Sequence, residues 1–158
     1  MDFRYLYTSF DGRINRKPLW IASVILFVVA IIISIVVLLP ISAVNTTLGA
    51  LASLILSLVL LFPGAALGVK RLHDQGKSGL LMIVFIIPGL ILQIGDLLGM
   101  TGSYQIIAGH SIHMPNTLGW FLNLMTFGVA IWALVTLGFL KGNSGANAYG
   151  PDPLMGGA

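Results

Sequence analysis

The chain has 158 residues, of which 57% are hydrophobic and 8% are charged, and it contains no cysteine. A soluble domain carries about a quarter charged residues, so this composition excludes a soluble globule of this size and predicts a protein dissolved mainly in the lipid bilayer. The lack of cysteine excludes disulfides and thiolate sites, and the net charge of +3 comes from basic residues scattered among short segments, which suits membrane topology and anionic lipids rather than nucleic acid.

Residues 1–12 form the first predicted element, a short segment at the membrane interface. Aromatic side chains, among them Phe3, Tyr5 and Phe10, are interleaved there with polar and charged residues. Aromatic rings suit the depth of the lipid head groups. We therefore expect this segment to lie on the membrane surface just before the first span.

Four apolar runs follow, at residues 19–39, 48–67, 80–98 and 118–140. At about 1.5 Å per residue each run reaches roughly 28 to 34 Å, which matches a hydrocarbon core of about 30 Å. Backbone amides in lipid must be paired internally, so runs of this length must be helices. The first run could also be a cleaved signal peptide, but it is longer than a typical signal core and three more runs follow it. The sequence thus predicts an all-α, single-domain bundle of four transmembrane helices.

The basic residues predict the orientation of the bundle. They flank the start of the first run, the connection between the second and third runs, and the end of the fourth, at Arg4, Arg13, Arg16, Lys17, Lys70, Arg71, Lys77 and Lys141. The other two connections, residues 41–47 and 99–117, have no Lys or Arg. An even number of spans puts every basic residue on one side, which the positive-inside rule assigns to the cytoplasm. We therefore expect both termini to be cytoplasmic in a bacterial inner (plasma) membrane.

Small residues and prolines interrupt the apolar runs. Gly49, Ser53 and Ser57 recur every four residues and would let helix backbones approach closely. Pro63 and Pro88 should kink their helices. These features have two interpretations: helix packing alone, or hinges for a transport cycle.

Polar residues near the outer side offer a second set of candidates. Gln93 and Asp96 lie near the end of the third run. An acid in a span is a candidate for transport, but Asp96 lies within the last turn, and the sequence favours a solvated helix end over a transport role. His110 and His113 are three residues apart and could face the same side of a helix, with Asp96 as a third metal ligand. The pattern is short, so we expect neither a metal nor another cofactor.

Three polar segments, residues 10–17, 70–79 and 142–153, lie on the predicted cytoplasmic side. Six basic residues would ring this end of the bundle and bind anionic head groups or phosphate, namely Arg13, Arg16, Lys17, Lys70, Arg71 and Lys77. The alternative is that they only fix the topology and extend to the interface. Asp11 and Asp74 could pair with the arginines. Residues 142–158 are rich in Gly and Pro, so they should form an extended, mobile tail.

The neighbours His73 and Asp74 suggest a proton relay. Adjacent residues on a helix do not face each other, so the pair is not itself a catalytic dyad. Ser78 is the nearest candidate nucleophile. We therefore expect no enzymatic activity.

The polar segments also carry the motifs of a known family. The first segment matches at Phe10, Gly12, Arg13, Arg16 and Trp20. The second matches at Arg71, Leu72, His73, Asp74, Gly76, Lys77, Ser78 and Gly79, and the third at Gly142, Gly145, Asn147, Tyr149, Gly150 and Pro153. Over nearly its whole length the chain resembles the domain of unknown function 805 family, the YhaH-like bacterial inner-membrane proteins. The resemblance implies a membrane location and no particular activity. Residues expected to build the motif structure are Gly12, His73, Asp74, Ser78, Asn147 and Tyr149.

Two functions remain open. The first is a non-catalytic module that binds anionic lipid or a partner membrane protein through its cytoplasmic basic face. The second is a small transporter or channel, built as a homo-oligomer, that uses Gln93, Asp96 and the kinked helices. A permeation path needs several inward polar groups, and the runs offer few, so the sequence favours the module.

Overall fold

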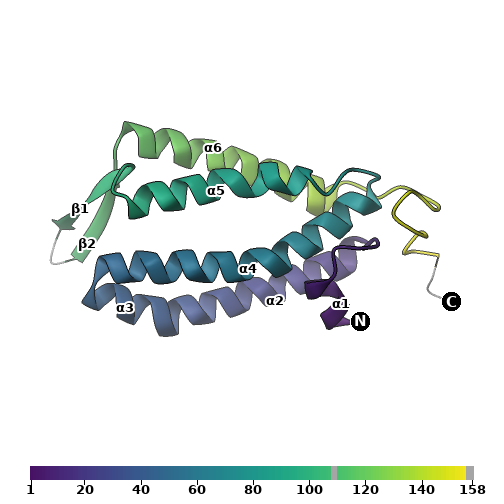
Figure 1. Ribbon diagram of the computed structural model, residues 1–158, viewed down its shortest axis with the longest axis horizontal. Coiled ribbons are helices and arrows are strands. Elements are labelled where there is room, and N and C mark those ends of the chain that lie inside the picture. The colour runs from purple at the N-terminus through teal and green to yellow at the C-terminus, as the bar shows by residue number, and fades with distance from the viewer. Residues whose placement is uncertain (108–109, 156–158) are drawn as a thin grey trace.

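The computed structural model describes residues 1–107 and 110–155, and these form an elongated, mostly helical bundle (Figure 1). Its elements in chain order are α1 (Phe3–Thr8), α2 (Arg16–Ile33), the π-helix η1 (Ser34–Leu38), α3 (Leu39–Val44), α4 (Thr46–Asp74), α5 (Leu81–Leu97), β1 (Gly102–Ile107), β2 (His110–Pro115), α6 (Thr117–Leu134) and the π-helix η2 (Val135–Phe139). Helix α4 runs back along α2 and α3, and α6 runs back along α5. The N-terminus and the C-terminal segment lie at the same end of the bundle, which we call the basal end; it comprises residues 10–20, 70–79 and 136–155.

An asparagine begins each of the three long helical segments. The side chain of Asn15 accepts a hydrogen bond from the backbone N–H of Lys17, and that of Asn45 accepts one from Leu48. Asn116 accepts one from Gly119 in the same way. The first N–H groups of a helix have no partner within it, so an asparagine at this position supplies one. At Asn45 the cap also lets the chain reverse direction on one non-helical residue between α3 and α4.

The apolar runs predicted to be helical are helical. Three continuous helical segments are long and apolar enough to cross a membrane: Arg16–Val44 with 29 residues, Thr46–Asp74 with 29 and Thr117–Phe139 with 23. The third run forms Leu81–Leu97, a shorter apolar helix. Helix α4 continues well past the predicted limit of residue 67, so Lys70, Arg71 and Asp74 lie on its last turns rather than in a loop.

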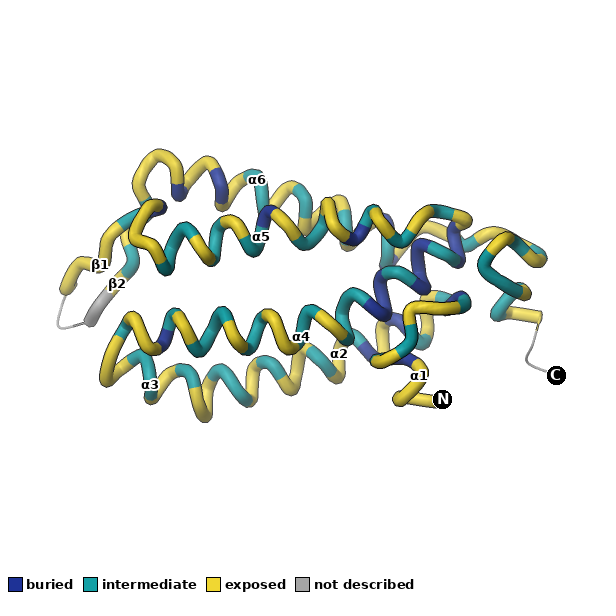
Figure 2. Tube along the Cα trace, viewed as in Figure 1, coloured by how far each residue is buried: buried dark blue, intermediate teal, exposed yellow. Residues whose placement is uncertain are grey.

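Apolar side chains remain exposed along most of the helices, and buried residues gather at the basal end (Figure 2). In the most apolar 18-residue stretch of Arg16–Val44, no residue is buried within the protein. In the corresponding stretch of Thr117–Phe139, only 17% of the residues are buried. A core cluster of Leu6, Ile14, Leu19, Ala22 and Leu67 lies partly in the basal end and partly directly beside it. Lipid can solvate the exposed apolar faces, whereas polar backbone groups at a helix end need partners from the protein. The molecule is therefore held together most tightly where its helices end.

The small residues of α4 have different surroundings. A Cβ atom added at Gly49 would lie 2.8 Å from Cα of Ser42 in α3, so this glycine permits close contact of the two helices. Ser57 instead donates a hydrogen bond to Gln93 of α5, at 2.6 Å. Pro63 and Pro88 lie inside α4 and α5, and the kinks expected at them stay a prediction.

The outer connection corrects the all-α prediction. Strands β1 and β2 pair as an antiparallel hairpin, with Gly102 opposite Pro115 and Ile107 opposite His110. His110 and His113 thus lie on a strand, and the helix face that would have brought both imidazoles together for a metal does not form. A segment outside the hydrocarbon core of a bilayer need not satisfy its amides as a helix, and here the paired strands satisfy amides between them.

Candidate functional site

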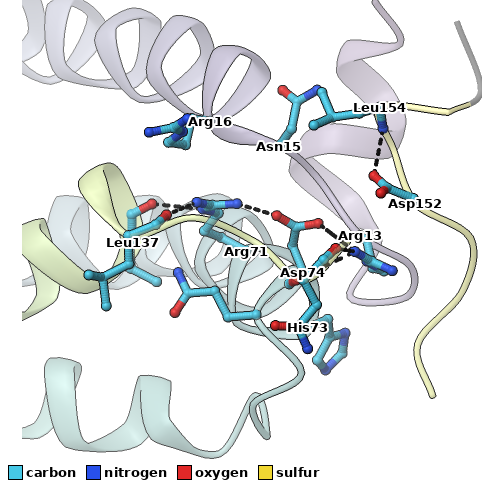
Figure 3. A network of polar contacts seen from close by, with 12 residues as sticks. Arg13, Asn15, Arg16, Arg71, His73, Asp74, Leu137, Asp152 and Leu154 are labelled. Carbon is cyan, nitrogen blue, oxygen red and sulfur yellow. Dashed lines mark hydrogen bonds and ion pairs between the residues drawn. The ribbon is translucent and has the colours of Figure 1, made fainter. Parts of the chain in front are cut away.

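Asp74 lies at the centre of a buried polar network at the basal end (Figure 3). Its Oδ1 accepts hydrogen bonds from Nη2 of Arg13 at 3.1 Å and from Nε at 3.2 Å, while its Oδ2 pairs with Arg71 one turn earlier on α4. The Asp74 side chain is 4% exposed and each arginine side chain 1%. Buried charges are tolerated only when paired and hydrogen-bonded. One carboxylate therefore fixes the segment before α2 to the end of α4.

The remaining donors of Arg13 bind the C-terminal segment. Nη1 donates to the carbonyl of Gly145 at 2.7 Å and to that of Gly150 at 3.2 Å, and Nη2 donates to Asn143 at 2.7 Å. In the described part of the segment predicted to be an extended, mobile tail over residues 142–158, a buried guanidinium thus takes backbone carbonyls as acceptors, and the mobility of the segment stays a prediction. Residues 156–158 lie outside the described residues.

The motif residues of the second and third polar segments meet at His73. The ring of Tyr149 stacks on the His73 imidazole, with centroids 3.8 Å apart and planes 4° apart. Asn147 donates to the His73 carbonyl at 2.9 Å, and Nδ1 of His73 lies 3.3 Å from the carbonyl oxygen of Gly12. His73 and Asp74 therefore face different partners, which leaves no His–Asp dyad between them. Gly12 adopts φ +82°, a conformation that favours glycine.

The end of η2 is capped by side chains from two other helical segments. Five consecutive carbonyls, those of residues 136–140, each accept a side-chain hydrogen bond. The donors are Gln75 to Thr136, Arg71 to Leu137 and Leu140, Trp20 to Gly138, and Arg16 to Phe139. The last carbonyls of a helix have no partner within it, and the negative end of its dipole favours cations. These donors thus stabilise a helix end that water would otherwise have to solvate.

Lys70 caps a different helix. Its Nζ donates to the carbonyls of Tyr5 and Leu6, at 2.6 and 2.7 Å, and lies 4.4 Å from the centroid of the Tyr5 ring. Lys70 is fully buried. The Tyr5 hydroxyl donates in turn to the carbonyl of Asp11; burial first, and then the charge of Asp11, raises the pKa of Tyr5. These contacts hold α1 against α4.

The six predicted anion ligands therefore fall into two groups. Arg13, Lys70 and Arg71 are buried and engaged by protein oxygens. Arg16 and Lys17 are exposed on the first turn of α2, and Lys77 is half-buried with its Nζ donating to Gln75. Ser78 is exposed and its hydroxyl accepts the N–H of Leu80, a local contact at the start of α5.

A cavity of about 620 Å³ lies between the start of α2 and the C-terminal segment; we call it the basic cavity. Its charged lining residues are Arg16, Lys17, Arg71, Lys141, Asp74 and Asp152. Lys141 is exposed beside it, and sequence reasoning did not include it among the anion ligands although it directly follows the fourth apolar run. Asp152 accepts the N–H groups of Leu154 and Gly145, and these hydrogen bonds lower the pKa of its carboxyl. With Asp74 already paired, this lining presents an excess of positive charge.

The residues suggested for transport lie toward the opposite end. Ser57, Gln93 and Asp96 line a second cavity of about 640 Å³ between α4 and α5. Asp96 accepts a hydrogen bond from Thr101, and its Oδ1 is 3.9 Å from Nε2 of His113. Among the described residues no group of three or more metal-ligand side chains comes together.

Comparison with known proteins gives the following matches. Residues 7–151 match the family described as "Protein of unknown function (DUF805)". The chain is 29% identical over 145 residues to "Uncharacterized protein YiiR" of Escherichia coli strain K12, covering 91% of this chain and 85% of that protein. It is 27% identical over 150 residues to "Inner membrane protein YhaI" of the same strain, covering 95% of this chain and 90% of that protein. No solved structure matches the chain significantly.

Proposed function

The chain belongs to the DUF805 family of proteins of unknown function, and from that premise we propose that it is a non-catalytic inner-membrane module that binds phosphate-bearing lipid head groups at its cytoplasmic face. A relative of similar length is named an inner membrane protein, and apolar helices long enough to span a bilayer support the same location. The basic residues of the basal end support a cytoplasmic position for that end.

In the proposed topology all four apolar helices span the membrane. Helix α5 has 17 residues, which corresponds to roughly 26 Å and lies at the lower limit for a span of about 30 Å. Helix α5 runs beside α6. If both helices cross the membrane, the two ends of this helix pair lie at opposite membrane surfaces. Both termini are then cytoplasmic.

The observation that carries the proposal is the basic cavity. Arg16, Lys17 and Lys141 are exposed at its edge, at the end of the apolar helices where lipid phosphates lie. A basic residue near such a surface contributes about 1 kcal/mol of attraction. The acids of the cavity do not cancel this attraction fully, because Asp74 is bound by two buried arginines.

The buried network supports a non-catalytic role. Asp74 has both oxygens occupied by arginines, and His73 is stacked on Tyr149. A general base needs a free acceptor within reach of the reacting group. The two motif residues best suited to acid–base chemistry, His73 and Asp74, therefore serve to hold segments of the chain together.

The test compares two double variants that remove equal charge. Lys17→Gln with Lys141→Gln alters the basic cavity, and Arg4→Gln with Lys77→Gln alters basic residues outside its lining. Phosphatidylglycerol and phosphatidylcholine bound to purified protein are measured by native mass spectrometry. At about 1 kcal/mol per residue, the cavity variant should lose about 30-fold in relative affinity for phosphatidylglycerol, and the matched control should keep it. Equal loss of affinity in both variants would mean that phosphatidylglycerol responds to the overall positive charge and not to a site at the basic cavity.

A second candidate function rests on the cavity between α4 and α5. Ser57 and Gln93 are hydrogen-bonded across it and Asp96 lies at its edge. An acid and an amide at this depth could form part of a solute path in a homo-oligomer. In that case the Asp96→Asn variant, reconstituted in vesicles, should lose flux of ions or small solutes; unchanged flux would remove Asp96 from any such path.

A further inference from the structure

A third cavity lies inside the bundle at the depth of the apolar helices. Its volume is about 460 Å³, and α2, α4, α5, α6 and η2 all contribute to its wall. Its lining includes Trp20, Gly64, Leu67, Phe85, Ala133 and Leu137. We call this space the apolar cavity, because Ser23 is the one residue of its lining with a polar side chain other than the indole of Trp20.

Gly64 shows that the apolar cavity is a real space between helices. In a membrane helix, glycine usually lets a neighbouring backbone approach, and Gly68 on the next turn does lie against Met82. A Cβ atom added at Gly64, however, would meet nothing within 4 Å. The absence of a side chain at Gly64 therefore leaves an open space beside α4 and does not serve close packing against a neighbouring helix.

The apolar cavity adjoins the basic cavity. Arg71 lines the basic cavity, and its Nε donates at 2.9 Å to the carbonyl of Leu137, which lines the apolar one. On α2, Arg16 lines the first and Trp20 the second, one turn apart and thus separated by about 6 Å along the helix axis. Trp20 is held by its hydrogen bond to Gly138 and its edge contact with Phe139. A polar space at the basal end thus lies directly beside an apolar one further along the helices.

We infer that the two cavities form one lipid site, with a phospholipid phosphate in the basic cavity and one acyl chain of the same molecule in the apolar cavity. The inference rests on the proposed head-group function and adds the class of ligand and the position of its chain. A partner helix, about 10 Å across with its side chains, is too wide for this volume. A single acyl chain is thin, flexible and abundant at this depth. Filling the space restores the close contacts that packed apolar side chains otherwise lose at a void.

The experiment uses the full-length protein in phosphatidylcholine nanodiscs. The probe is phosphatidylglycerol that carries a photoreactive diazirine in one acyl chain, and mass spectrometry locates the labelled residues. Labelling is expected at Phe85 and Ala133, which line the apolar cavity and are half-buried. Gly64→Leu, which fills the apolar cavity, should abolish it there. Gly128→Leu is the matched control, because an added Cβ at Gly128 also meets nothing within 4 Å and the residue lies outside the cavity lining.

The outcomes separate this inference from the proposed function. Labelling confined to lipid-facing residues such as Phe127, or labelling at Phe85 that survives Gly64→Leu, would overturn the chain site while phosphatidylglycerol binding could still hold. Equal labelling of the apolar cavity by a phosphatidylcholine probe with the same chain, unaffected by the Lys17 and Lys141 double variant, would overturn both. If Gly64→Leu is recovered aggregated, the labelling pattern of the wild-type protein decides the question alone.

Discussion

Replacing Asp74 by Asn removes the charge at the centre of the basal network and changes the side-chain volume little. The carboxylate accepts from Arg13 on one oxygen and Arg71 on the other, and all three side chains are buried. An amide keeps one acceptor but presents an NH₂ group to one of the two guanidinium groups. We therefore expect Asp74→Asn to leave two buried positive charges without a counter-ion.

The size of the effect follows from that burial. Removing one partner of a buried ion pair costs about 3–5 kcal/mol, because the other charge remains buried and uncompensated. Both arginines also donate to carbonyls, of Gly145 and Leu137 among others, and these bonds persist in part. We therefore expect a loss of about 3 kcal/mol, near the lower limit, in the free energy of unfolding. The C-terminal segment should loosen first, because Arg13 is its main attachment.

The assay combines two measurements on protein in detergent micelles. Equilibrium unfolding gives the change in free energy, and hydrogen exchange reports the backbone N–H of Asn143, which donates to the carbonyl of Asp74 at 2.7 Å. Asp11→Asn is the matched control, since Asp11 is exposed and pairs with no basic group in the described part of the chain. If Asp74→Asn behaved like Asp11→Asn in both measurements, within about 0.5 kcal/mol, the network would not stabilise the basal end.

Three further predictions concern single contacts. Gly12→Ala should destabilise the protein by about 1–2 kcal/mol in the same unfolding assay, because φ +82° disfavours an L side chain; no change would mean that this turn adapts freely. Lys70→Gln should free α1, because a shorter neutral side chain cannot reach both carbonyls of Tyr5 and Leu6; the expected result is faster proteolysis before Gly12, and unchanged cleavage would contradict it. Protection of the Gly145 N–H should be constant above the ordinary aspartate pKa of 3.8 and fall as the pH drops through the lower pKa of folded Asp152, because the folded state favours the charged carboxylate; in Asp152→Ala, which has no side-chain acceptor, protection should be low at every pH.

The predicted apolar helices are present because their cause is local. Each run is uniformly apolar over its own length, and lipid forces such a backbone to satisfy its amides internally. The outer strands were not predicted because residues 102–107 and 110–115 lie beyond the apolar runs and pair with each other through backbone groups that no side-chain pattern specified. The extent of α4 to Asp74 was missed for the opposite reason. The last turns of α4 carry charged residues, a composition typical of a loop. In the folded chain these residues are buried and form hydrogen bonds with other segments of the bundle.

The basal network, too, was predictable from the sequence only in part. Sequence reasoning collected Arg13, Arg71 and Asp74 into motifs and expected Asp74 to pair with arginine. It also grouped six of the basic residues as anion ligands, with Lys70 and Arg71 among them. Only the folded chain shows that Lys70 and Arg71 cap the ends of α1 and η2, while Lys17 and Lys141 remain exposed at a cavity. A lysine that fixes a carbonyl and a lysine that faces solvent are identical in a sequence, because their partners are far away along the chain.

The sequence by itself determined that this protein is a membrane protein of long apolar helices with its basic residues at shared ends, because hydrophobicity and charge act on each segment separately. Tertiary structure alone decided which of those charges are buried, which carbonyls they satisfy and where cavities remain between the helices. Those features depend on distances between groups that lie as many as 137 positions apart along the chain, as the Arg13 guanidinium and the Gly150 carbonyl do, and such distances are set only when the whole bundle packs.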